Sequence, residues 1–155
     1  MIKQLKIKNI QSHKDTVFDF EPGINVIAGS SNNGKTVTIR ALNWLVNNSG
    51  SASALCSNWN TDNKGNISGE MSAEITTEKG TVKKLRSKSE NKYILNDTVY
   101  EAVGKEIPEK VVAFFNFDET NIQSQMDSPF LLSMSGPDAT RFMNKIVKLD
   151  CIDTI

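Results

Sequence analysis

One stretch of this 155-residue sequence decides how the chain folds: Gly29-Ser30-Ser31-Asn32-Asn33-Gly34-Lys35-Thr36. It matches the pattern G-x-x-x-x-G-K-[ST], in which glycines allow positive φ angles and backbone N–H groups turn inward to hold phosphate oxygens. Lys35 is expected to reach the β- and γ-phosphates of a nucleotide, and the Thr36 hydroxyl to bind Mg²⁺. The predicted phosphate-binding residues are Gly29, Ser30, Ser31, Asn32, Asn33, Gly34, Lys35, Thr36 and Val37.

The segments on either side of this loop have the periodicities that a phosphate-binding loop requires. Residues 24–28 read Ile-Asn-Val-Ile-Ala, a short and nearly all apolar run that predicts a strand buried on both faces. After Lys35, apolar residues recur at helical spacing until the stop signal at 47–50. The order strand, loop, helix therefore predicts an α/β fold of the P-loop NTPase class.

Antiparallel strands are predicted on both sides of this unit. Each is a short run of alternating apolar and polar residues bounded by turn residues. The runs lie at 5–8, 17–20, 71–76, 81–86 and 93–100, the last with a tight turn at Asn96-Asp97. Residues 49–65 are rich in Ser, Asn and Asp without a clear period, which predicts an exposed loop that Trp59 pins.

Two helices are predicted after the strands. Pro108 can start the first, whose buried side is expected to consist of Val111, Val112, Phe114 and Phe115. Ser135 can cap the second, and an apolar stripe then continues toward Ile155 without a stop signal. This stripe consists of Ala139, Phe142, Met143, Ile146, Leu149 and Ile152. Its face is expected to self-associate or to bind a partner.

The composition is that of a folded globular domain, with 38% hydrophobic residues and 18 basic against 18 acidic side chains. Cys56 and Cys151 lie far apart without metal-ligand spacing, which favours a reducing, cytoplasmic setting over a disulfide-bonded or zinc-binding domain. No segment is apolar enough for a signal peptide or a membrane span, so no membrane association is expected. Residues 79–92 hold six basic side chains against Glu90, a run more typical of a solvated strand face than of a polyanion site.

Other classes of P-loop protein fit the rest of the sequence less well. A small-molecule kinase supplies arginines from a lid, whereas this chain has only Arg40, Arg86 and Arg141. A GTPase needs an N-K-x-D element, and the nearest string, at 63–66, lacks the aspartate. Both classes usually begin at the P-loop strand, but a basic pair of predicted strands precedes it here. A small P-loop kinase therefore stays the weakest hypothesis.

Residues 2–45 resemble the start of the ABC-type ATPase heads of the SbcC, RecF and structural-maintenance-of-chromosomes (SMC) group. The shared features are the opening strand, an N-x-x-S-H turn at 9–13, a G-I-N-x-I-x-G strand at 23–29 and the P-loop. A second block, 121–132, resembles the Q-loop of this family, in which a glutamine meets Mg²⁺ and the attacking water. The register favours Gln125 over Gln123 as that glutamine.

The resemblance implies that residues 1–155 form the N-terminal lobe of such a head, with an antiparallel β subdomain and a mixed sheet around the P-loop helix. Residues 136–155 would begin the helix that leads to a coiled coil. Lys35 and Gln125 would be catalytic, Thr36 and Gln125 would bind Mg²⁺, and ATP would be the nucleotide. The resemblance also implies a C-terminal lobe, a second head, an SbcD-like nuclease and DNA as partners.

Some features of the sequence depart from the family or only imitate it. Family members commonly carry an arginine near the phosphates where this chain has Gln11, and Lys14 is the substitute that the sequence offers. Residues 111–119 superficially resemble a Walker B strand, but a helix explains them better. Residues 132–136 superficially resemble an ABC signature, but a helix cap explains them better. No secure general-base carboxylate is present. A non-hydrolysing, nucleotide-dependent assembly module is therefore the alternative to an ATPase.

Overall fold

The computed structural model describes residues 1–101, 106–117, 121–123 and 134–146. The chain divides into two units, Met1–Asp118 and Glu119–Ile155. The first unit holds all of the described strands and the phosphate-binding loop, and the second holds one described helix.

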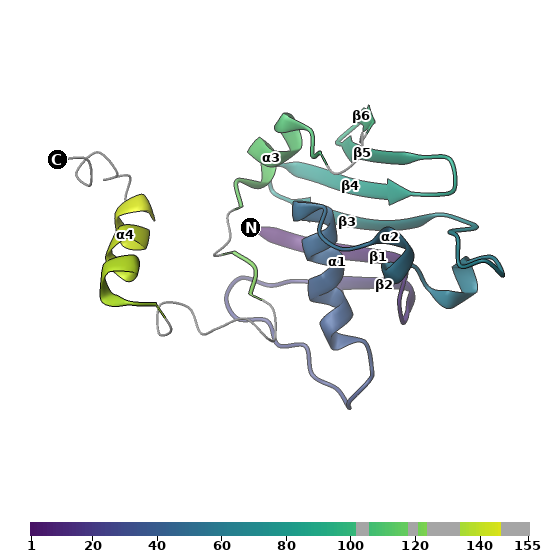
Figure 1. Cartoon of the computed structure of the whole chain (residues 1–155), viewed down its shortest axis with the longest axis horizontal. Helices are drawn as coiled ribbons and strands as arrows, with labels where there is room; N and C mark the ends of the chain where they lie inside the picture. Colours follow the sequence, from purple (N-terminus) through teal and green to yellow (C-terminus); the bar gives the residue numbers. More distant parts are fainter. Residues whose placement is uncertain (102–105, 118–120, 124–133, 147–155) are drawn as a thin grey trace. The chain divides into compact units, whose positions relative to one another are not determined.

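The first unit is built on a six-stranded sheet with the order β2-β1-β3-β4-β5-β6 (Figure 1). Its strands are β1 (Ile2–Ile10), β2 (His13–Asp19), β3 (Met71–Thr77), β4 (Gly80–Arg86), β5 (Asn91–Leu95) and β6 (Thr98–Glu101). Every neighbouring pair is antiparallel, and each predicted alternating run is confirmed as a strand. Asn96, with φ 53°, closes the turn between β5 and β6 as predicted.

Helices α1 (Lys35–Asn47) and α2 (Ala52–Leu55) lie on one face of this sheet (Figure 1). The sequence dictates this layering, because the apolar members of each alternating strand point to the same face and α1 presents an apolar stripe to them. The core between the sheet and the helices includes Leu5, Ile7, Ala41, Trp44, Leu45, Met71, Ala73, Ile75, Val82 and Tyr93. Helix α1 ends where Asn48 takes a left-handed conformation, with φ 50°, which confirms the predicted stop.

The predicted exposed loop at 49–65 is wrong in part. It contains α2 and the 3-10 helix η1 (Asn58–Asn60), and it buries Leu55, Cys56 and Asn60. Hydrogen bonds tie it to the turn after β1, with Gln11 N donating to Leu55 O at 2.8 Å and Ser57 N donating to Asn9 O at 3.1 Å. The segment is thus fixed by contacts with residues far away in the sequence. Cys56 is a free thiol whose pKa is raised by burial.

The prediction of a buried strand at 24–28 is wrong. This segment has no strand partner among the described residues, and its apolar side chains are open to solvent. Ile24 is 95% exposed and Val26 is 81% exposed. Figure 1 shows the chain leaving the sheet after β2 and returning only at α1. The mixed sheet expected around the P-loop helix is therefore not formed within the described residues, since its first strand is unpaired.

Helix α3 (Glu109–Phe115) starts after Pro108, as predicted, and rules out a Walker B strand at this position. Its predicted buried side is only partly correct, because Val111 is fully buried but Val112 is 49% exposed. In the second unit, α4 (Gly136–Ile146) follows Ser135, whose Oγ accepts a hydrogen bond from Asp138 N at 3.4 Å. Met143 on α4 is 47% exposed, while Leu149, Ile152 and Ile155 lie outside the described residues.

Candidate phosphate-binding site

The loop at 29–34 leads directly into the N-terminus of α1. Gly34 takes φ +81° at the cap position, a conformation that a side chain would strain, and Val37 N donates to Gly34 O at 2.9 Å. No side chain caps this end of α1, and its first turn contains no acidic residue. Because the first N–H groups of a helix lack internal partners and carry partial positive charge, this end can accept an anion.

Lys35 bends back over the loop that precedes it. Its Nζ donates to Gly29 O at 2.7 Å and to Ser30 O at 2.6 Å. The ammonium therefore lies over the loop in which the N–H groups would hold phosphate oxygens. A bound polyphosphate can replace these carbonyl contacts with charge-assisted ones, which are about twice as strong as neutral hydrogen bonds.

The turn between β1 and β2 packs against Gly34. His13 Nε2 lies 3.1 Å from Gly34 O, and His13 Nδ1 lies 3.0 Å from Thr16 Oγ1. A Cβ atom on Gly34 would fall 2.3 Å from Ser12 Oγ. His13 is thus a structural residue of the turn, and Ser12 and His13 together fix the position of the loop. The sequence did not indicate this contact, because it joins residues more than twenty positions apart.

Thr36 lies in the first exposed turn of α1, next to Lys35. Its hydroxyl is a hard oxygen ligand, and Mg²⁺ usually takes only one or two protein ligands together with phosphate oxygens and waters. The described residues contain no cluster of three or more His, Cys, Asp or Glu side chains that could hold a metal ion by themselves. The hydroxyl of Thr36 has the ligand chemistry of a magnesium site beside a nucleotide, and its role as a ligand stays a prediction.

The structure brings the residues predicted at 29–37 together in one loop and helix turn. The side chain of Val37 is buried, so only its backbone can face a ligand. Gln125, Asp118 and Glu119 lie outside the described residues, and Gln123 is an exposed residue of the second unit. The Q-loop assignment thus stays a prediction.

Arg40 is a cation near this site that the sequence analysis did not select. Its Nη1 donates to Gln11 Oε1 at 3.1 Å, which joins α1 to the turn after β1. The signal that could have found it is its position four residues after Thr36, on the same face of a predicted helix.

The opposite end of α1 is anchored by a buried lysine. Lys84 on β4 is 1% exposed, and its Nζ donates to Trp44 O at 3.1 Å and to Asn48 Oδ1. The same ammonium lies 4.5 Å from the ring centroid of Trp44 and 5.0 Å from that of Tyr93. Burial, and to a smaller extent the charge of Arg86, lower the pKa of Lys84 to about 7. Burial also raises the pKa of Tyr93 well above its ordinary value.

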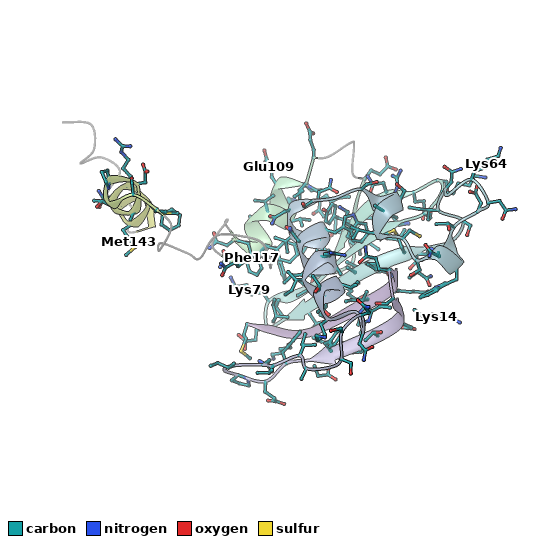
Figure 2. The ribbon with its side chains drawn as sticks, turned by 60° about the horizontal axis from the view of Figure 1, so that its bottom comes forward. Lys14, Lys64, Lys79, Glu109, Phe117 and Met143 are labelled. Atoms are coloured by element: carbon teal, nitrogen blue, oxygen red, sulfur yellow. The ribbon has the colours of Figure 1, made fainter. Side chains whose placement is uncertain are left out.

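The basic run at 79–92 is thus not a uniformly solvated face. Lys84 is buried, Lys83 pairs with Glu70 at 3.3 Å, and Lys92 pairs with Glu90 at 2.9 Å. A surface hollow of about 630 Å³ gathers the cations Lys64, Arg86 and Lys88 around one carboxylate, Asp62. Hydrogen bonds from Asn66 lower the pKa of Asp62. Lys64 projects from the loop before β3 (Figure 2).

No described helix combines the length and the apolar content that crossing a membrane requires. Comparison with known proteins finds partial matches to two DNA-repair ATPases. Two proteins named DNA double-strand break repair Rad50 ATPase, from Archaeoglobus fulgidus and Methanopyrus kandleri, are each 43% identical over 42 residues. These matches cover 27% of this chain and 5% of each relative.

Solved structures show the same fold at low sequence identity. A structure described as "Structural biochemistry of ATP-driven dimerization and DNA stimulated activation of SMC ATPases" superposes with a TM-score of 0.58 at 16% identity, and the match covers 99% of both chains. The recombination mediator protein RecF, in complex with ATP, superposes with a TM-score of 0.53 at 13% identity over 66% of this chain and 29% of RecF.

The family described as AAA domain matches residues 4–142, which is most of the chain. The match includes β1, β2, the phosphate-binding loop, the rest of the sheet and most of α4. The chain therefore belongs to this AAA domain family, and it has the P-loop fold of the N-terminal part of an SbcC/SMC/RecF-like ATPase head.

Proposed function

We propose that this chain is the ATP–Mg²⁺-binding N-terminal part of an SbcC-like ATPase head that acts in DNA repair or recombination in the cytoplasm. The observation that carries the proposal is the arrangement at the loop 29–34. The loop leads into the uncapped N-terminus of α1, and the ammonium of Lys35 lies over the same loop. A site with backbone N–H groups, one ammonium and one adjacent hydroxyl suits a nucleoside triphosphate and its magnesium ion. Thr36 supplies that hydroxyl.

A C-terminal lobe of the same ATPase type is the proposed partner of this part. The segment at 24–28, which has no strand partner among the described residues, supports it, because Ile24 and Val26 expose large apolar side chains directly before the phosphate loop. An apolar, β-branched segment without partners leaves both backbone and side chains unsatisfied. Strands from another lobe could pair with it and complete the mixed sheet that the family resemblance implies.

Hydrolysis is proposed to require that lobe and a second head. Phosphoryl transfer needs groups that orient water and stabilise developing charge, and Lys35 and Thr36 alone do not orient water. Gln125 is the proposed water- and magnesium-binding residue of this chain. The alternative is a nucleotide-dependent assembly module that binds ATP without hydrolysing it, and the absence of a secure general-base carboxylate in the sequence favours this for the isolated chain.

DNA and an SbcD-like nuclease are the further proposed partners. The related structures support a DNA-linked role, since one is described by DNA-stimulated activation and the other as a recombination mediator. On this chain, the hollow that contains Lys64, Arg86 and Lys88 is a candidate contact for the phosphate backbone. The nuclease partner rests on the family resemblance alone.

Calorimetric titration with ATP and Mg²⁺ tests the site. Lys35→Ala should weaken ATP binding at least tenfold, because a lost charge-assisted contact costs about 1.5–3 kcal/mol. Lys64→Ala, on a loop that contributes nothing to the site, is the matched control and should bind ATP as the wild type does. Equal affinity in the wild type and Lys35→Ala would refute the assignment.

A single-turnover assay separates the ATPase from the assembly module. Bound ATP should persist on the isolated chain and be hydrolysed once the C-terminal lobe is added. ATP that stays intact in the reconstituted head dimer would favour the assembly module. A phosphoacceptor screen with labelled ATP would detect the kinase alternative.

A further inference from the structure

Arg40 is the second cation on the exposed side of α1. It lies four residues after Thr36, and both residues are exposed while Val37, Thr38 and Ala41 face the core. Helical side chains lean toward the helix N-terminus, and residues four apart lie one above the other. The guanidinium of Arg40 therefore extends from the second turn of α1 toward the end that carries Thr36 and the phosphate loop.

Gln11 holds this guanidinium in place from the turn after β1. Its Oε1 accepts the hydrogen bond from Arg40, while its Nε2 donates to Ala54 O at 3.3 Å. Its backbone is fixed as well, because Gln11 N donates to Leu55 O and Ser57 Oγ donates to Gln11 O at 2.7 Å. These contacts set which end of the amide faces Arg40. The next two residues of the same turn, Ser12 and His13, touch Gly34.

Within the part of the chain that the structure describes, no carboxylate neutralises the charge of Arg40. None of the ion pairs of the described residues includes Arg40, and the first turn of α1 contains no acid. A guanidinium carries five N–H donors, and the Gln11 amide uses one of them. Arg40 is an exposed residue whose other donors have no partner among the described residues, and it lies on the helix whose positive end, with Lys35, forms the proposed site.

We infer that Arg40 is a second cationic contact for the polyphosphate of the bound nucleotide and that Gln11 is the residue that positions it. This inference rests on the proposed function, because it assumes a nucleotide at the 29–34 loop. Lys14, the substitute that the sequence offered, is less suited to this part. It projects into solvent from β2 (Figure 2) and is not on the helix that begins at the phosphate loop.

Calorimetric titrations of ATP, ADP and AMP against the full chain test the role of Arg40. Arg40→Ala should weaken ATP binding about tenfold and AMP binding much less, because the lost contact is with the terminal phosphates. Arg40→Lys should recover part of the ATP affinity, and the salt dependence of ATP binding should be smaller in Arg40→Ala than in the wild type. A purely structural role would alter the unfolding temperature and would not discriminate ATP from AMP.

Gln11→Glu tests the positioning role with a nearly isosteric change. The new carboxylate should pair with Arg40 and withdraw it from the nucleotide, so ATP affinity should fall nearly as far as in Arg40→Ala. The double variant should be little weaker than either single variant if the two residues act together. Lys14→Ala is the matched control and should bind ATP as the wild type does.

Three results would overturn the inference in distinguishable ways. If Arg40→Ala binds ATP with wild-type affinity while Lys35→Ala does not, the nucleotide site stands and Arg40 is not part of it. If Lys14→Ala instead loses ATP affinity, the second cation is Lys14. If the wild type binds no ATP, the proposed function fails and the role of Arg40 fails with it.

Discussion

Replacement of Lys84 by methionine should change how the stability of the fold depends on pH. The ammonium of Lys84 is buried against Trp44 and Tyr93 and pairs with no carboxylate among the described residues, so its charged form is costly to bury. Its pKa in the folded chain is about 7, against 10.5 as the ordinary value. Between these values the unfolded chain binds more protons than the folded chain, so the free energy of unfolding rises with pH in this window.

The size of the effect follows from the two pKa values. Below pH 7 both states carry the proton and the full cost of burying the charge is present. From pH 7 to pH 9 the wild type should gain about 2 kcal/mol of unfolding free energy relative to Lys84→Met, with a limiting slope of about 1.4 kcal/mol per pH unit. Tyr93 should not disturb this window, because its raised pKa keeps the phenol neutral.

Urea unfolding of both proteins at pH 6, 7, 8 and 9 measures this difference. Lys83→Met is the matched control, since Lys83 is the neighbouring residue on β4 and pairs with Glu70 at a partly exposed site. It should show the same pH profile as the wild type. A constant stability difference between the wild type and Lys84→Met from pH 6 to pH 9 would show that Lys84 stays charged in the fold, and would refute the reasoning.

Three further changes test other parts of the structure. Gly34→Ala should lower both ATP affinity and the unfolding temperature, because its Cβ would fall 2.3 Å from Ser12 Oγ at a backbone φ of +81°; wild-type values for both would contradict the described loop. Gln125→Ala should leave ATP binding intact and reduce hydrolysis in the reconstituted head, whereas a loss in Gln123→Ala instead would move the Q-loop register by two residues. Val26→Asp should weaken binding of a C-terminal lobe in pull-down assays while the sheet of the isolated chain stays folded, because Val26 is 81% exposed.

Elements with local signals were predicted from the sequence, whereas elements that depend on distant partners were not. Helix α1 follows from a glycine with positive φ, a helical apolar period and an asparagine stop, all of which act over a few residues. The segment at 24–28 has the composition of a buried strand, yet a strand exists only when another strand accepts its hydrogen bonds. The described residues provide none for it.

Whether a charged or polar residue is buried or exposed can be predicted only when its position in the strand register is considered. Lys84 alternates with Val82 on β4, and both face the helix layer opposite Tyr93 and Leu95 of β5. The alternation of Val82 and Lys84 is visible in the sequence. Counting the basic residues at 79–92 as one group does not separate the strand positions that face the core from those that face solvent. The contact between Arg40 and Gln11 could not be predicted in the same way, because it depends on how the turn after β1 meets α1 in space.

The segment at 24–28 and the phosphate-binding loop at 29–34, the two proposed contact sites of this chain, are consecutive in its sequence. The unpaired segment at 24–28 runs directly into Gly29, and Lys35 folds back onto the carbonyls of Gly29 and Ser30. Any partner strand that pairs with 24–28 would therefore also fix the direction in which the chain enters the phosphate loop. Nucleotide bound in the loop would in turn order the residues that the partner strand must meet. Because coupling between two binding sites is reciprocal, ATP should tighten binding of the C-terminal lobe by the same factor as that lobe tightens binding of ATP.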